Sequence, residues 1–242
     1  MAHKGKNIAA SLVLIISLGL VLAWSLSRQG FFASAPEPLA IAQAAIKNTF
    51  AYPSYTFKTR SVLYLDDEER VFSVLEGEKT AQGRHVWGSI LGTGVNVYHI
   101  NGNFYLQDAL SGKWNLVGNT DLKAAATLIE ELNPEKNFYF ADWGTAEDFG
   151  KGEIDGKKAQ HICLKPVLED KWIEQYFKDI TFDLYIINAL KEPKLLYTQI
   201  SGVSKENTGA KLVIENYFAG YGKKIIINEP QLPPPEGERV QP

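Results

Sequence analysis

The chain has 242 residues, of which 45% are hydrophobic and 12% aromatic, and its formal net charge is −3. This composition is typical of a folded β-rich protein and excludes a largely disordered chain. The slight negative charge argues against a nucleic-acid partner, because nucleic-acid binding normally needs a basic face. Cys163 is the single cysteine, which excludes a disulfide within the chain. We interpret it as a buried structural thiol, since its surroundings alternate as in a strand.

The amino-terminal stretch predicts the compartment. Residues 1–7 form a short cytoplasmic segment containing Lys4 and Lys6, and an uncharged run from Ile8 to Leu26 follows. A helix of this length spans about 28 Å, close to the thickness of the hydrocarbon core of a bilayer. Lysines before such a run hold the amino end in the cytoplasm. We therefore expect a single-pass anchor at residues 8–26 in the cell membrane, with the rest of the chain extracytoplasmic.

The same stretch allows a second interpretation. Ala33-Ser34-Ala35 resembles a signal-peptidase site, and cleavage near Ala35 would give a secreted protein. The uncharged run is longer than the roughly 7 to 15 residues usual for a cleavable signal, which favours an uncleaved anchor with residues 27–35 as a linker. No cysteine follows the run to take a lipid, so a bacterial lipoprotein is excluded.

One domain is expected from residue 36 to residue 230. It begins with a helix, because Leu39, Ala42, Ile46 and Phe50 recur at helical spacing. From Ser54 the apolar residues alternate with polar ones, which is typical of strands. The clearest strand signal runs from residue 95 to residue 117, where Asn101-Gly102 and Ser111-Gly112 predict two hairpins.

The second half of the chain continues this pattern. Helices are predicted at 120–132 and 168–178, a strand at 136–142, and a hairpin turning at Asp155-Gly156. Further strands are expected at 180–187, 195–203 and 212–218, with a last short one at 223–228. The expected fold is α+β: a curved antiparallel sheet of about 10–11 strands, forming an incomplete half-barrel, with about three helices on its concave face. Residues 231–242 are rich in proline and predict a disordered tail.

The sequence offers little for catalysis. The histidines His3, His85, His99 and His161 show neither helical metal-ligand spacing nor a His-Glu motif. No serine lies in a nucleophile elbow, and the glycine pairs do not open a helix as a phosphate loop does. We predict a protein that is not an enzyme and uses neither a metal nor a cofactor.

What remains is apolar surface on the predicted strands. Its residues could complete an ordinary core, or they could line a pocket for small or lipid molecules, and composition does not separate these possibilities. The candidates for a lipid cavity are Phe57, Leu63, Val86, Val97, Phe104, Phe138, Phe140, Phe182, Leu184, Ile186, Leu212 and Ile214.

Four segments carry a resemblance to a known family. They are the strand at 54–57 after the first helix, the turn-strand-turn stretch 101–114, the turn at 155–158, and the closing segment 215–227. Their order resembles the LolA/LolB superfamily, and within it the extracytoplasmic proteins of the LppX/LprG type.

That resemblance implies an incomplete antiparallel barrel with helices in its mouth and a hydrophobic cavity for acyl chains. The expected function is non-catalytic binding of lipid or lipoprotein acyl chains, for transport or presentation at the cell envelope. The chain departs from its lipoprotein relatives because it offers a protein anchor in place of an acylated cysteine. An anchored protein cannot shuttle freely, so a second hypothesis stays open: a membrane-tethered sensor or scaffold that binds a protein partner of the envelope.

Overall fold

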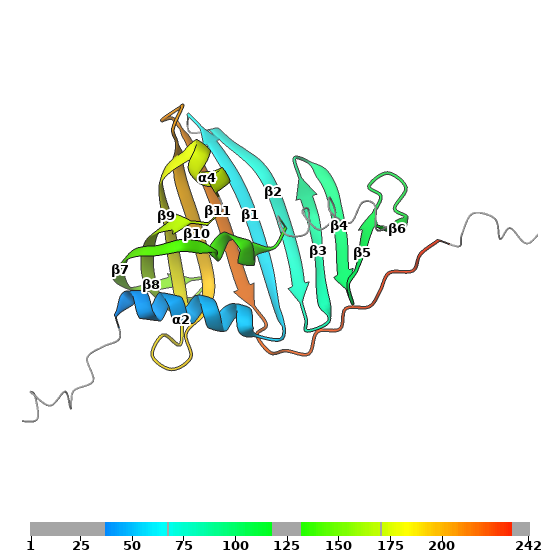
Figure 1. Ribbon diagram of the computed structural model, residues 1–242, viewed down its shortest axis with the longest axis horizontal. Helices are drawn as coiled ribbons and strands as arrows, with labels where there is room; N and C mark the ends of the chain where they lie inside the picture. Colours follow the sequence, from blue (N-terminus) through cyan, green and yellow to red (C-terminus); the bar gives the residue numbers. More distant parts are fainter. Residues whose placement is uncertain (1–36, 67, 118–131, 170, 234–242) are drawn as a thin grey trace, which may run out of the picture. The chain divides into compact units, whose positions relative to one another are not determined.

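Eleven antiparallel strands form a single sheet in the order β6-β5-β4-β3-β2-β1-β11-β10-β9-β8-β7 (Figure 1). The structure, a computed structural model, describes residues 37–66, 68–117, 132–169 and 171–233. The strands are β1 (Tyr55–Leu65), β2 (Glu68–Lys79), β3 (Gly83–Ile90), β4 (Thr93–Ile100), β5 (Asn103–Gln107), β6 (Trp114–Leu116), β7 (Phe140–Ile154), β8 (Lys157–Leu168), β9 (Phe177–Ile187), β10 (Lys194–Ser204) and β11 (Ala210–Ala219).

In the part of the chain that the structure describes, three helical elements accompany the sheet, namely α2 (Pro38–Ala51), the 3-10 helix η1 (Pro134–Phe138) and α4 (Lys171–Tyr176). The predicted anchor at 8–26 and nearly all of the helix predicted at 120–132 lie outside the described residues. Within the described residues, no helix is both long enough and apolar enough to span a bilayer. The chain divides into residues 1–37 and residues 38–242, and only the second unit is considered below.

The sheet is built from two meanders. Strands β1 to β6 follow one another, as do β7 to β11, and the meanders join where β1 pairs with β11 from Thr56↔Ala219 to Leu65↔Ala210. The sheet stays open, because β6 and β7 are its edges. The predicted number of strands and their antiparallel arrangement are therefore confirmed, whereas the described residues contain two α-helices.

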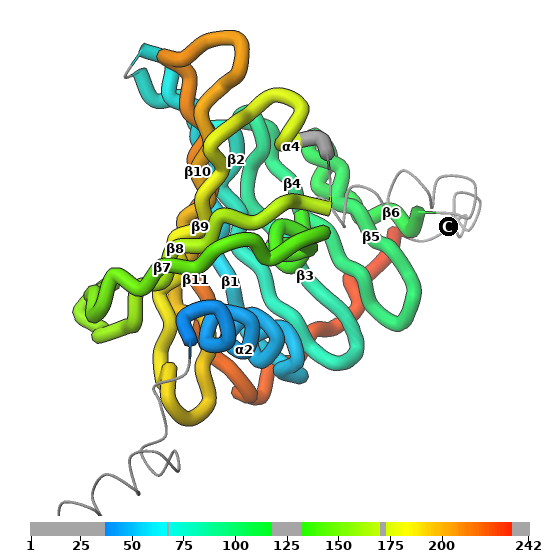
Figure 2. The backbone as a smooth tube through the Cα atoms, turned by 60° about the vertical axis from the view of Figure 1, so that its left-hand side comes forward, coloured from blue at the N-terminus to red at the C-terminus, as the bar shows by residue number. Residues whose placement is uncertain are grey.

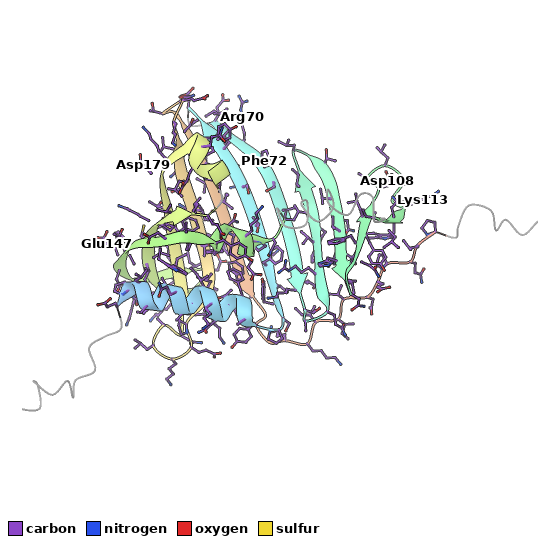
Figure 3. All side chains as sticks on the ribbon, viewed as in Figure 1. Arg70, Phe72, Asp108, Lys113, Glu147 and Asp179 are labelled. Atoms are coloured by element: carbon purple, nitrogen blue, oxygen red, sulfur yellow. The ribbon has the colours of Figure 1, made fainter. Side chains whose placement is uncertain are left out.

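Two hairpin turns have the backbone conformation that their sequences predict. Asn101 and Gly102 have φ angles of 51° and 81°, and Asp155 and Gly156 have 49° and 75°. These positive angles are the ones that a type I′ turn requires. The β5–β6 connection is longer than the two residues predicted, because the carboxylate of Asp108 accepts hydrogen bonds from the backbone N–H groups of the next turn (Figure 3).

One face of the sheet, here called the inner face, carries Phe57, Phe182 and Phe218 and forms the core with the helices. Helix α2 packs across β7 to β10, and α4 packs on β8 and β9 (Figures 1 and 2). The predicted stripe of α2 is confirmed: Ala42 and Ile46 are buried, and Leu39 and Phe50 pack against the same cluster.

Three predicted elements are wrong in detail. Of the strand predicted at 136–142, residues 140–142 belong to β7, whereas residues 136–138 are part of η1, because Asn133 caps a turn that begins with Pro134. Helix α4 covers only residues 171–176, since Leu168 still pairs with Phe140 and residues 177–178 already pair with β10. Residues 223–228 form no strand. Both neighbours of β11 are already strands of the sheet, so the chain that leaves it has no adjacent edge to join.

Candidate binding site on the inner face

Cross-strand register arranges the inner face in rows. One row runs from Phe57 on β1 through Gly77 and Val86 to Val97 on β4. The ring of Phe57 lies where a β-carbon on residue 77 would stand, so only glycine leaves room for it. Phe57, Val86 and Val97 are all buried. This row is apolar across four strands.

A cavity of about 160 Å³ lies on the same face, where β1, β2 and β11 meet η1 and α4. Its wall on the sheet is part hydroxyl and part hydrocarbon, with Thr59, Ser61 and Ser73 beside Leu75 and Ile214. The opposite wall comes from the segment around η1 and from α4. The remaining lining residues are Leu132, Pro134, Lys136, Asn137, Tyr139, Leu168 and Ile173.

The wall formed by η1 is held firmly on the sheet. Arg84 on β3 forms an ion pair with Glu135 at 3.0 Å, and both side chains are less than one quarter exposed. Phe138 is buried, with ring contacts to Phe50, Phe182 and Phe218. The cavity is therefore bounded by packed structure on both sides.

A polar row borders the apolar one, from Tyr55 through Lys79 and Arg84 to His99. The ammonium of Lys79 donates to the carbonyl oxygen of Phe50 at 2.6 Å. Burial lowers the pKa of Lys79. The pKa of His99 is also lowered, mainly by burial and further by the charge of Arg84. The row thus places cations beside apolar surface.

Tyr55 is the least satisfied member of this row. Its side chain is fully buried, and its hydroxyl has no hydrogen-bond partner among the described residues. Burial raises the pKa of this hydroxyl strongly, and the charge of Glu135 raises it further. A buried hydroxyl without a partner destabilises the fold, so this position marks a local polar defect in an aromatic cluster.

The twelve predicted cavity residues fall into three groups: one that lines the cavity, seven that are buried and four that are partly buried. Those on strands share the inner face by register, but most are packed into the core and do not border open space. Of the twelve, Ile214 lines the cavity of about 160 Å³. Seven are buried: Phe57, Val86, Val97, Phe138, Phe182, Leu184 and Ile186. The other four are partly buried, namely Leu63, Phe104, Phe140 and Leu212.

Prediction from apolar alternation missed most of the cavity lining. Thr59, Ser61 and Ser73 are polar, and the register that brings them together links β1 to β2. A break in the alternation could have identified them. Small hydroxyl residues occupy inner-face positions of β1 and β2, whereas Phe57 and Leu75 on the same face of these strands are large and apolar.

The other reactive side chains are engaged locally. His161 contacts Asp183 at 2.7 Å on the outer face, and His85 contacts Asn96 at 2.8 Å. Cys163 is only partly buried, which corrects the expectation of a buried thiol, and its surroundings raise its pKa through burial first. Among the residues that the structure describes, no three acidic, histidine or cysteine side chains are grouped as metal ligands would be.

Comparison with known proteins identifies the fold. No family model matches the sequence, and no curated protein matches it. Among solved structures, LprF from Mycobacterium bovis aligns with a TM-score of 0.51 and 13% identity, over 81% of this chain and 98% of that one. The lipoprotein LppX from Mycobacterium tuberculosis aligns with a TM-score of 0.51 and 12% identity, over 81% of this chain and 100% of that one.

A LolA superfamily protein from Nitrosomonas europaea aligns at 10% identity over 76% of this chain and 94% of that one, with a TM-score of 0.33, which is too low to support an argument. The matches to LprF and LppX show that the chain has their fold. The resemblance found in the sequence is thereby confirmed at the level of architecture.

Proposed function

We propose that this protein binds an acyl chain of a lipid or lipoprotein at its inner face, for transport or presentation at the cell envelope. The observation that carries the proposal is the cavity between β1, β2, β11 and the two helical elements η1 and α4, in a chain with the fold of LppX. Hydrocarbon walls beside Ser61 and Ser73 suit the end of an acyl chain that carries an ester or carboxyl group. No cofactor is needed for such binding.

The volume limits what the cavity holds. Sites for small molecules usually measure roughly 300–1,000 Å³, whereas this one measures about 160 Å³. It suits a short stretch of one chain rather than two full chains. Each buried methylene contributes about 0.8 kcal/mol, so a few methylenes give weak, exchangeable binding, which is appropriate for passing a lipid onward.

The compartment is part of the proposal. The anchor at residues 8–26 would hold the domain on the extracytoplasmic side of the cell membrane, and cleavage near Ala35 would instead secrete it. In either case residues 38–230 are the part that meets lipid. The tail that begins at residue 231 has no role in this account.

A second function is favoured by a different observation. Much of the inner face is filled, and apolar side chains are exposed elsewhere. On β2, Val71 is 45% exposed and Phe72 50% (Figure 3), and Leu91 in the neighbouring β3–β4 turn is 69% exposed. Exposed apolar side chains of this kind mark sites of protein contact. A membrane-tethered sensor or scaffold would use them to bind a partner protein in the envelope.

Native mass spectrometry with lipid extraction tests the first function against the second. The protein purified without denaturation should carry a lipid or fatty acid, and Ser61→Leu should remove it by filling the cavity. Ser89→Leu makes the same change on β3, two strands away and on the outer face, and it should leave the lipid bound. Protein that carries no extractable lipid and takes up no fluorescent fatty acid would favour the sensor or scaffold.

A further inference from the structure

An open groove of about 360 Å³ lies on a different part of the domain, where the ends of β7, β8 and β9 meet the β9–β10 loop. Its floor is apolar and includes Ala159 and Ile186, and its rim carries Lys151, Lys158 and Lys191. The groove does not share any lining residue with the cavity described above.

The charged residues that line this groove are all positive. No acidic residue lines it, and within the described residues its three lysines take part in no ion pair. Glu153 faces Lys158 across the β7–β8 pair but lies outside the lining. Glu192, next to the groove in sequence, is engaged by Lys194 at 3.0 Å. The groove therefore presents three lysines without an ion pair among the described residues, and Glu153 is the carboxylate nearest to them in the strand register.

An exposed leucine stands at the edge of this cationic rim. Leu190 lies in the β9–β10 loop and is 80% exposed. The loop is held in place, because the N–H groups of Lys191 and Glu192 donate to the carbonyl oxygen of Asn188 at 2.9 and 3.2 Å. The side-chain amide of Asn48 on α2 donates to the carbonyl oxygen of Pro193 at 3.1 Å. The loop thus presents an apolar side chain beside lysines in a fixed geometry.

The position of the groove points to the membrane as its occupant. The β9–β10 loop and the first residues of α2 lie at the same end of the sheet (Figures 1 and 2). Only residues 27–37 separate the predicted anchor from Pro38, and a fully extended chain of that length reaches at most about 40 Å. An anchor at residues 8–26 would therefore hold the start of α2 within about 40 Å of the bilayer.

We propose that this end of the domain docks on the outer surface of the membrane that holds the anchor, with Lys151, Lys158 and Lys191 binding anionic lipid headgroups and Leu190 entering the interfacial layer. Lysines near an anionic membrane attract it, and each contributes roughly a five-fold gain in binding. An apolar side chain beside them adds contact with the acyl boundary. Docking in this orientation would turn one end of the sheet toward the membrane, from which lipid is taken. The proposal rests on the predicted anchor.

The test uses the full chain in nanodiscs made of phosphatidylcholine alone or with 30% phosphatidylglycerol. Cys163→Ala removes the native thiol, and an environment-sensitive NBD fluorophore is attached at Leu190→Cys or at Leu110→Cys. Leu110 is a matched control, since it is 99% exposed in the β5–β6 loop at the opposite edge of the sheet. We expect a blue shift of emission at position 190 in the anionic discs and none at position 110.

Charge variants complete the test. K151Q/K158Q/K191Q should abolish the blue shift, as should high salt, because screening weakens exposed charges. K165Q/K178Q/K211Q removes the same charge from exposed lysines outside the groove and should retain the shift. Melting curves confirm that both variants fold. Equal emission at positions 190 and 110, a shift that survives the groove substitutions, or a chain that does not remain in the discs would overturn the proposal.

Discussion

The two halves of the sheet use the same antiparallel pattern for different purposes. In the half formed by β7 to β11 and β1, Phe182, Leu184 and Phe218 are at most 1% exposed beneath α2 and η1. In the half formed by β2 to β6, the inner face also buries apolar residues such as Val86 and Val97. Beside them it carries small residues such as Gly77 and Gly88, and a row of cationic and polar side chains. Alternation alone makes a two-faced sheet, and the helices that pack on it decide where it becomes core.

The cavity lies at the border between these halves. Ser61 and Ile214 belong to the half covered by helices, whereas Ser73 and Leu75 belong to β2. Large side chains fill the inner face on one side of this border, and the hydroxyl residues at the border leave space. The comparison therefore predicts unequal responses to substitution on the two sides.

The largest effect is expected in the covered half. Phe182→Ala removes a fully buried ring and should lower the free energy of unfolding by about 3–5 kcal/mol. Phe104→Ala on β5 removes a partly buried ring and should cost about half as much. Urea denaturation of both variants measures the difference. Equal losses would show that the two halves are packed alike.

A smaller effect is expected where the halves touch. Gly77→Ala would place a β-carbon against the ring of Phe57, which must then shift, so a loss of about 1–3 kcal/mol is expected. Gly94→Ala on β4 is the matched control, because nothing lies within 4 Å of its β-carbon. Thermal unfolding of both variants decides the matter, and a Gly77→Ala protein as stable as the control would refute this packing.

The contact between η1 and β3 should contribute less. Replacing Arg84 with Met or Glu135 with Gln breaks an ion pair at 3.0 Å that is shielded from solvent only in part. A double-mutant cycle should give a coupling of about 1 kcal/mol. A coupling near zero would mean that Phe138 alone holds η1 on the sheet.

The smallest effect is a dependence on pH. Burial and the charge of Arg84 lower the pKa of His99 below its usual value of 6.5. As the pH falls below about 6.5, the unfolded chain therefore takes up the proton first, and stability present above that pH is progressively lost. The melting temperature should fall from pH 7 toward pH 5, and less so in His99→Phe. An identical slope in both proteins would contradict this assignment.

Local sequence signals predicted much of the fold. The turns at Asn101-Gly102 and Asp155-Gly156, the stripe of α2 and the alternation of the strands each depend on neighbouring residues, and all appear in the structure. The mistakes arose where a distant partner decided the outcome. Phe138 and Phe140 alternate like a strand, yet Asn133 and Pro134 start a helical turn that packs Phe138 into the core.

The site was less predictable than the fold. Apolar candidates such as Phe182 and Ile186 were chosen because large residues line lipid pockets, but large residues also fill cores. The space lies instead beside Ser61 and Ser73, which are brought together by register between β1 and β2. Only Ile214 belongs to both sets. Alternation in the sequence predicts which face of a strand is apolar more readily than it predicts where the packing leaves a cavity.

Photo-crosslinking with a fatty acid that carries a diazirine near its carboxyl end tests the central claim most directly. Peptide mapping should place the label on residues that line the cavity, such as Leu75, Ile173 and Ile214, and Ser61→Leu should abolish it. Label on the exposed apolar side chains Val71, Phe72 and Leu91, or no label in the folded protein, would contradict acyl-chain binding at the inner face.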